Sequence, residues 1–157
     1  MTLHRLSPKN QVTIPREARA LAAAVAGAPI THLRGKRHVV RKGTTGAEFR
    51  IVLLMTELEL QKREERILAD GTLSDDQKFE YVTSLNDEMK MLSIDGQNRI
   101  VLPAEFVAHL GIGDSKDVKF VCTNTVIQAW NPEHHLAYSG KDAEPGYDPV
   151  LTKYLSL

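Results

Sequence analysis

The feature that most constrains the fold of this chain is an internal repeat with an offset of 88 residues. Residues 3–17 align with residues 91–105 without a gap. Identical residues at matching positions are Asn10 and Asn98, Pro15 and Pro103, Glu17 and Glu105, and Ala20 and Ala108. Apolar residues also match: Leu3, Leu6, Val12 and Ile14 fall on Met91, Ile94, Ile100 and Leu102. The chain therefore carries two copies of one local structure.

Each copy predicts a short strand, a polar turn, a second strand and a helix. The turns are Ser-Pro-Lys-Asn at 7–10 and Asp-Gly-Gln-Asn at 95–98, which are residue types that favour turns. Apolar residues then alternate over 12–14 and 100–102, as in a half-buried strand. Pro15 and Pro103 open the helices, and Gly27 and Gly111 are the predicted helix ends.

The remaining segments give each half a similar ending. Residues 117–121 and 125–130 predict a hairpin, followed by a helix capped by Asn131. In the first half, residues 47–54 predict a strand, and Thr56 and Glu59 form a capping-box pattern at the start of a helix that runs to about residue 69. A second capping-box pattern predicts a helix over 74–86. Between these elements the first half carries about a dozen extra residues, a basic insertion at about 31–48.

Neither half is large enough to bury a core alone, so the two must pack against each other. We expect an α+β fold of two pseudo-symmetric β-hairpin/helix halves, packed as an intramolecular pseudo-dimer. The expected organisation is a first half over 1–69, a connecting helix over 70–88, a second half over 89–138 and an extended tail over 139–157.

The charge is distributed unevenly although the net charge is zero. Residues 1–50 hold ten Lys and Arg but two acidic residues, Glu17 and Glu48, whereas residues 51–157 have a net charge of −8. A basic segment of this kind is suited to a polyanion such as nucleic acid. It is equally suited to an acidic partner subunit, and charge alone does not separate the two interpretations.

Composition narrows the class of protein further. The chain has 157 residues, of which 42% are hydrophobic and 25% charged, values typical of a folded domain. No apolar run is long enough to span a bilayer, and the first residues lack the apolar core of a signal peptide. The single cysteine, Cys122, excludes an internal disulfide and a multi-cysteine zinc site. We therefore expect a soluble, cytoplasmic protein without a membrane partner.

The first copy, Leu6-Ser-Pro-Lys-Asn-Gln-Val-Thr-Ile-Pro-Arg-Glu, resembles the signature of AbrB-like transition-state regulators and MazE-like antitoxins. Together with the second copy, Asp95-Gly-Gln-Asn-Arg-Ile-Val-Leu-Pro, and the later Ile127-Gln-Ala-Trp-Asn-Pro-Glu, the chain resembles the MraZ family over most of residues 1–138. The resemblance implies two AbrB-like (SpoVT-like) halves and a bacterial, nucleoid-associated regulator of the division and cell-wall gene cluster. Its implied partners are double-stranded DNA and further copies of itself, assembled into a ring-like homo-oligomer.

The resemblance also implies a DNA-contact motif, Asp-x-x-x-Arg, which falls on Asp95 and Arg99. The carboxylate can orient the guanidinium toward a phosphate or a guanine edge. The alternative is a structural ion pair without a ligand. In the first copy Ser7 and Gln11 stand at the matching positions.

Basic and polar residues near the first turn complete the candidate DNA-binding set, which is Arg99, Asp95, Arg5, Lys9, Gln11, Arg16, Lys36 and Arg37. Lys36 and Arg37, from the basic insertion, are expected to bind phosphate whatever the DNA sequence.

Other functions have little support in the sequence. There is no phosphate-binding glycine loop, nucleophile elbow or catalytic carboxylate pair, so we expect no enzyme activity, cofactor or small-molecule substrate. His134 and His135 are adjacent and lack further ligands at suitable spacing, so no metal site is expected. Trp130, Phe120 and Cys122 are expected in the core. The alternative function is an antitoxin-like or scaffold module whose main ligand is a protein partner.

Overall fold

The computed structural model describes residues 3–42, 46–114 and 116–139, which form an α+β fold. Its strands are β1 (Leu3–Arg5), β2 (Gln11–Thr13), β3 (His32–Lys42), β4 (Ala47–Met55), β5 (Lys90–Ser93), β6 (Arg99–Val101), β7 (Asp117–Cys122) and β8 (Ile127–Trp130). Its helices are α1 (Arg16–Ala26), α2 (Glu57–Ala69), α3 (Asp75–Asp87), α4 (Ala104–Leu110) and α5 (Pro132–Ser139). Among these residues, no helix has the length and apolar character that crossing a membrane requires.

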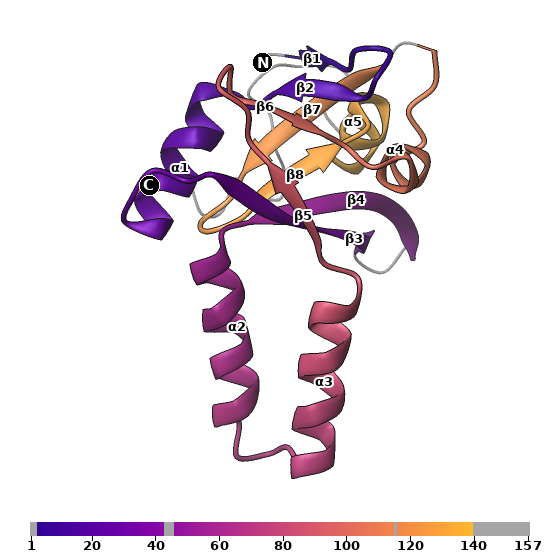
Figure 1. Ribbon diagram of the computed structural model, residues 1–157. Helices are drawn as coiled ribbons and strands as arrows, with labels where there is room; N and C mark the ends of the chain where they lie inside the picture. Colours follow the sequence, from indigo (N-terminus) through magenta and orange to yellow (C-terminus); the bar gives the residue numbers. More distant parts are fainter. Residues whose placement is uncertain (1–2, 43–45, 115, 140–157) are drawn as a thin grey trace, which may run out of the picture.

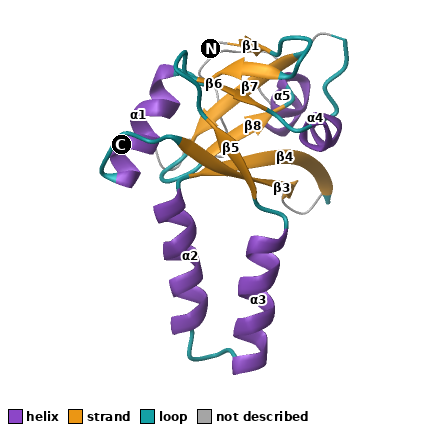
Figure 2. Ribbon diagram, viewed as in Figure 1, coloured by secondary structure: helices purple, strands orange, loops and turns teal. Residues whose placement is uncertain are grey.

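The strands form one curled antiparallel sheet and one small ribbon. The sheet has the order β1-β7-β8-β4-β3-β5, and the separate two-stranded ribbon, called the ribbon below, consists of β2 and β6. The ribbon lies at one end of the molecule, and α2 and α3 project from the opposite end as a pair of helices (Figures 1 and 2). We call this helix pair the arm.

The two copies of the repeat exchange strands. β1, from the first copy, pairs with β7, with Leu3 opposite Lys119. β5, from the second copy, pairs with β3, with Leu92 opposite Leu33. The second strands of the two copies pair with each other in the ribbon. The expected hairpin within each copy is therefore wrong: three-residue strands gain little from pairing locally, whereas pairing across the halves incorporates them in ladders over a common core.

A single core joins residues from both halves. The inner side of the ribbon, α1, α4 and the covered face of the sheet all contribute to it, and its largest members include Phe106, Leu33, Leu54 and Ile127. β3 approaches α4 closely at Gly35, where an added Cβ would lie 2.9 Å from Phe106 Cε2. Because each half supplies part of this core, neither half has a complete core of its own.

The basic segment at 31–48 is part of a long hairpin. It supplies β3 and the start of β4, which pair from Arg34 opposite Met55 to Lys42 opposite Ala47. The second half has a shorter equivalent in β7 and β8. The extra residues of the first half thus lengthen two strands. Their polar composition hides this in the sequence, because much of β3 is exposed or half-buried and shows no clean apolar alternation.

The arm begins and ends where the capping patterns predict. The Thr56 side chain accepts a hydrogen bond from Glu59 N at 3.1 Å, and Ser74 and Gln77 form a complete capping box. The start of α2 is fixed to β3 by Glu57, which accepts hydrogen bonds from Arg34 at 3.0 Å and from His32 at 2.9 Å. Partial burial raises the pKa of Glu57, but the hydrogen bonds from Arg34 and His32 outweigh it and leave this pKa below its usual value.

The other predicted boundaries agree with the structure. α1 and α4 begin directly after Pro15 and Pro103 and end at Gly27 and Gly111, both of which have positive φ. Asn131 accepts a hydrogen bond from Glu133 N at 2.9 Å and so caps α5. Of the expected tail at 139–157, residue 139 ends α5 and residues 140–157 lie outside the described residues.

The exchanged strands predict that neither half folds alone. Residues 1–69 contain β1 and β2 without their partners β7 and β6, and residues 89–157 contain β5 without β3. We expect each fragment to be unfolded or aggregated, and the two co-expressed fragments to form a folded complex. NMR spectra of the separate fragments test this, and a well-dispersed spectrum from either fragment as a monomer would contradict it.

Candidate nucleic-acid interface

The ribbon has a polar outer face and an apolar inner face. In β2 and β6, Val12 and Ile100 are opposite each other and buried. The alternate positions point outward, with Gln11 opposite Val101 and Thr13 opposite Arg99. Period-two alternation therefore places Gln11 and Arg99 on the same outer face, as diagonal neighbours.

The position of the ribbon is fixed by reciprocal backbone bonds between the two copies. Ile14 N donates to Asn98 O, and Leu102 N donates to Asn10 O, each at 2.9 Å. Asn10 and Asn98 have φ of 61° and 60°, a left-handed conformation that asparagine tolerates better than most residues. This explains why asparagine ends both turns.

Each turn is closed by a side-chain oxygen at its first position. Ser7 Oγ accepts hydrogen bonds from Lys9 N at 3.2 Å and Gln11 N at 3.1 Å. Asp95 Oδ1 accepts from Gln97 N and Arg99 N, both at 2.9 Å. Serine thus performs the turn-closing role of aspartate with one oxygen, but it has no second oxygen for another side chain.

The second oxygen of Asp95 holds two side chains of the outer face. Asp95 Oδ2 accepts from Arg99 Nε at 2.9 Å and from Gln11 Nε2 at 3.3 Å. The backbone hydrogen bond from Arg99 is the largest cause of the lowered pKa of Asp95, and the Gln97 N–H and Arg99 side chain lower that pKa further. The Arg99 side chain remains 37% exposed, so its outer nitrogens can reach a ligand.

Three predicted basic residues lie around the first turn. Arg5 is in β1 and forms an ion pair with Asp117 at 3.3 Å, yet its side chain is 70% exposed. Lys9 is exposed in the turn itself, and Arg16 is exposed in the first turn of α1. The first copy therefore contributes positive charge, while the second copy contributes the oriented arginine.

Lys36 and Arg37 lie elsewhere, beside the arm. Lys36 Nζ is 3.5 Å from Ser84 O, and Arg37 Nη2 is 3.3 Å from Glu88 Oε1. The structure does not bring these two residues together with the ribbon set. Their expected binding to phosphate stays a prediction.

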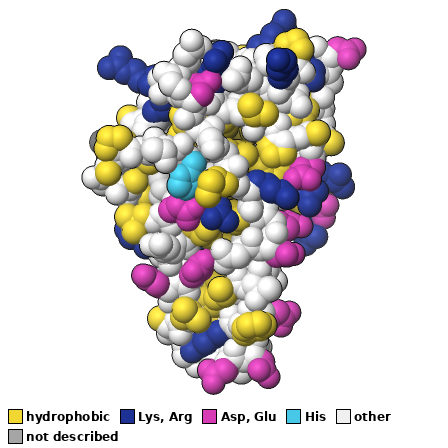
Figure 3. Space-filling model, in the orientation of Figure 1, with side chains coloured by type: hydrophobic (Ala, Val, Ile, Leu, Met, Phe, Trp, Pro, Cys, Tyr) yellow, Lys and Arg dark blue, Asp and Glu magenta, His cyan; other side chains and the backbone are white. Residues whose placement is uncertain are grey.

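The charge of the molecule is segregated along its length. Residues 57–87, which make up the arm, hold nine acidic and four basic residues. Figure 3 shows Lys and Arg side chains projecting from the end that carries the ribbon, and Asp and Glu side chains around the arm. A polyanion is therefore attracted to the ribbon end of the molecule and repelled from the arm.

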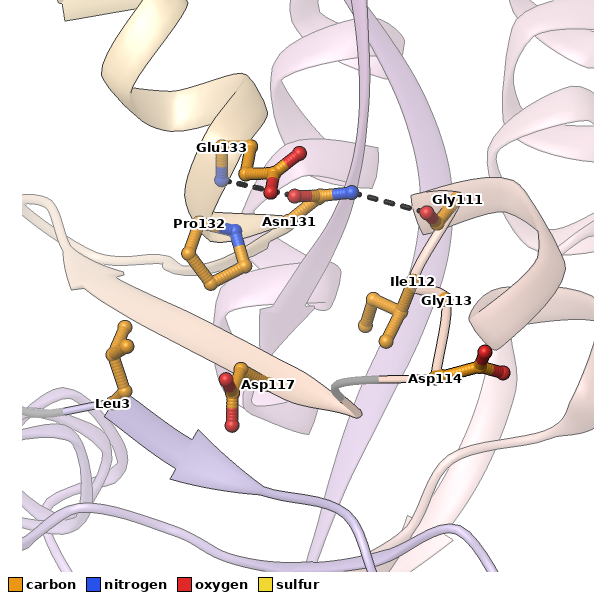
Figure 4. A pocket seen from close by; sticks show the side chains of 9 residues that line it. All are labelled: Leu3, Gly111, Ile112, Gly113, Asp114, Asp117, Asn131, Pro132 and Glu133. Atoms are coloured by element: carbon orange, nitrogen blue, oxygen red, sulfur yellow. Dashed lines mark hydrogen bonds between the residues drawn. The ribbon is translucent and has the colours of Figure 1, made fainter.

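A pocket near β1 is unsuited to phosphate. Figure 4 shows its lining, which includes the carboxylates of Asp114, Asp117 and Glu133 beside the Asn131 amide. Asn131 Nδ2 donates to Gly111 O at 3.1 Å, so this amide joins the end of α4 to the start of α5. We therefore leave this acidic pocket outside the candidate interface.

Of the residues expected in the core, Trp130 is buried and Phe120 is partly buried against it. The expected burial of Cys122 is wrong: it is exposed at the end of β7, where alternation points it away from the core. His135 packs edge-on against Trp130 at a centroid distance of 5.0 Å. Among the described residues, no group of three or more His, Cys, Asp or Glu is arranged to hold a metal ion.

Sequence reasoning missed three residues of this surface. Thr13 and Val101 share the outer face with Gln11 and Arg99, and both are exposed. Lys116 lies beside the first turn, where its carbonyl accepts from Leu6 N at 2.8 Å and its Nζ is 3.5 Å from Asn10 Oδ1. The strand alternation contains the signal for Thr13 and Val101, whereas the position of Lys116 depends on a contact across 106 residues.

These features define a class of surface: a two-stranded antiparallel ribbon with an oriented arginine on its outer face, an element that fits the DNA major groove. The chain is similar to the transcriptional regulator MraZ from two strains of Rickettsia bellii, with 31% identity in each case over 72 residues. The matched residues make up 46% of this chain and 47% of each relative, so the chain spans about half the length of the curated relatives it matches. No protein-family model matches the chain. The two similarities confirm the resemblance to MraZ seen in the repeat residues.

The two oxygens of Asp95 predict different effects for two substitutions. Asp95→Ala removes the turn-closing acceptor and should lower the melting temperature. Asp95→Ser should lower it less, because Ser7 closes the matching turn with a hydroxyl. Since the folded-state pKa of Asp95 lies below its model value of 3.8, its contribution is fully present above about pH 4 and is lost as pH falls further. Both variants should therefore lose less stability than the wild type on acidification. Thermal unfolding from pH 7 to pH 2 measures this, and equal acid sensitivity in all three proteins would contradict it.

Proposed function

We propose that this chain is a sequence-specific, DNA-binding transcriptional regulator of the MraZ type. The observation that carries the proposal is the Arg99 guanidinium, held by Asp95 on the exposed outer face of the ribbon. With Nε bound to Asp95, the two outer nitrogens of Arg99 are directed away from the carboxylate. Paired N–H donors of this kind match O6 and N7 of guanine.

The size and shape of the ribbon support the same proposal. The major groove of B-DNA is wide enough to admit a two-stranded β-ribbon. The ribbon is short, its outer face is polar, and it stands at one end of the molecule, away from the arm (Figure 1). Approach along this end brings the outer face to the base edges and places the acidic arm far from the phosphates.

Phosphate contacts come from basic residues around the ribbon. Arg5, Lys9 and Arg16 flank the first turn, and each exposed side chain can bind a phosphate without reading the sequence. Such contacts provide affinity and register, whereas Arg99 provides discrimination. We therefore assign positioning to the first copy and base contact to the second.

The finer organisation is also part of this proposal. We take residues 1–69 and 89–138 as AbrB-like halves of an intramolecular pseudo-dimer, with 70–88 as a connector. The exchange of strands and the reciprocal bonds at Asn10 and Asn98 support this view. By the resemblance, the regulator acts in the cytoplasm at the nucleoid, on a cell-division and cell-wall gene cluster, and has no enzyme activity.

A second function, binding of a protein partner, is favoured by the surface of the arm. Phe79 is 75% exposed, and Leu68 and Tyr81 are also exposed on the same helix pair. A shallow groove lined by Leu68, Lys78, Phe79 and Val82 runs between the helices. Large apolar side chains gathered in this way are typical of protein contact surfaces. The arm thus supports the antitoxin-like or scaffold alternative without competing for the ribbon.

Salt titrations separate base contact from charge. Arg99→Ala should lose about 1–3 kcal/mol of discrimination between specific and scrambled duplexes, because a bidentate guanine contact disappears. Lys9→Ala and Arg16→Ala should weaken both duplexes alike and reduce the log–log salt slope by about 0.9 per lost contact. Lys36→Ala combined with Arg37→Ala should leave the slope unchanged, since these residues bind Ser84 and Glu88. The measurement is fluorescence anisotropy with DNA from upstream of the gene.

Two outcomes of these titrations would contradict the assignment. Full discrimination by folded Arg99→Ala would make the Asp95–Arg99 pair structural. A reduced slope for the Lys36 and Arg37 variant would extend the DNA-binding surface along β3, beyond the ribbon.

The ring-like homo-oligomer implied by the resemblance predicts a mass several times the 17.5 kDa of one chain. Light scattering during size-exclusion chromatography, at several protein concentrations, measures the mass. A single mass of one chain at all concentrations would contradict self-association. Removing DNA beforehand with nuclease and high salt excludes assembly on a bound polyanion.

A further inference from the structure

The two copies of the repeat differ at the positions that face the DNA in the proposed function. Where the second copy has Asp95 and Arg99, the first has Ser7 and Gln11. Ser7 Oγ is already occupied by the N–H groups of Lys9 and Gln11. It therefore offers nothing to orient the Gln11 side chain, which must find its support elsewhere.

That support comes from the other copy. Gln11 Nε2 donates to Asp95 Oδ2 at 3.3 Å, across the ribbon and 84 residues away in sequence. Arg99 Nε donates to the same oxygen at 2.9 Å. One carboxylate oxygen thus holds the outward-facing side chains of both copies.

The donors and acceptors left over define what each side chain can read. Arg99 retains the paired N–H groups of Nη1 and Nη2, which suit guanine. Gln11 retains its second Nε2–H and its Oε1, because a primary amide has two donors and a carbonyl. A donor and an acceptor side by side match N7 and N6–H of adenine.

The shared oxygen also limits the distance between the two side chains. Arg99 Nε and Gln11 Nε2 are no more than about 6 Å apart, because each is bonded to Asp95 Oδ2. Base pairs stack at about 3.4 Å along the helix axis. Two side chains held this close reach base pairs that are one or two steps apart.

We propose that Gln11 is a specificity-determining residue, held beside Arg99 by Asp95, that reads an adenine one or two base pairs from the guanine read by Arg99. The two copies then form one asymmetric reading unit and do not bind two equivalent half-sites. Asp95 is a positioning residue for both contacts. This inference rests on the proposed DNA-binding function and specifies the class of sequence that it recognises.

The test uses the full chain and a duplex library with a randomised central segment, selected by binding and then sequenced. The wild type should select a guanine and an adenine within two base pairs. Gln11→Ala should lose the adenine preference, by roughly 5- to 150-fold in relative affinity, and keep the guanine. Arg99→Ala should show the reverse. Asp95→Ser should weaken both preferences together.

A gain of function distinguishes reading from a merely structural role of Gln11. Ser7→Asp combined with Gln11→Arg restores the motif in the first copy and should convert the selected adenine into a second guanine. Gln97→Ala is the matched control, because it removes a glutamine from the same end of the ribbon whose backbone N–H alone contacts Asp95. It should leave both preferences intact. Thermal unfolding checks that each variant is folded.

The outcomes separate this inference from the proposed function. If the wild type selects a sequence and Arg99→Ala erases its guanine, but both Gln11 variants select the wild-type sequence, DNA binding stands and the role of Gln11 is wrong. If the wild type selects no sequence, or folded Arg99→Ala selects the wild-type sequence, the proposed function itself fails.

Discussion

Pairing between β2 and β6 joins residue 12 to residue 100 and sets the position of both turns, both helices that follow the prolines, and both outward-facing polar side chains. The ribbon has just three residues in each strand, yet its inner side chains belong to the largest core cluster. Burial of Val12, Ile14, Ile100 and Leu102 stabilises the pairing far more than its few hydrogen bonds can. The candidate interface is therefore built on the hydrophobic core, and its outer face is free to be polar.

The same constraint explains why one carboxylate can serve both copies. Antiparallel pairing with Gln11 opposite Val101 and Thr13 opposite Arg99 makes Gln11 and Arg99 diagonal neighbours. A shift of one residue would move one of them to the inner face. The core fixes the register, the register fixes the distance, and Asp95 fixes the orientation. Rigid support of this kind reduces the entropy lost when side chains bind a ligand.

Local signals made much of the fold predictable from the sequence. Prolines, glycines, asparagines and capping residues mark the ends of α1 to α5, and those boundaries agree with the structure. Exchange of strands was not predictable, because nothing within residues 3–14 states that β1 pairs with residues 117–119. β3 was missed because Gly35 and its basic residues obscure the alternation. The Gln11–Asp95 bond depends on the ribbon register and so follows from the tertiary structure alone.

Exchange of strands also sets the order in which the chain can be completed during synthesis. β1 is the first strand to leave the ribosome, but its partner β7 lies 116 residues later, with Leu3 opposite Lys119. At about 5–20 residues per second, translation takes roughly 6 to 23 s to provide that partner. During this time β1 is an unpaired strand edge, the kind of segment through which nascent chains associate wrongly. Its length of three residues, with Arg5 at its end and Pro8 soon after, limits that hazard.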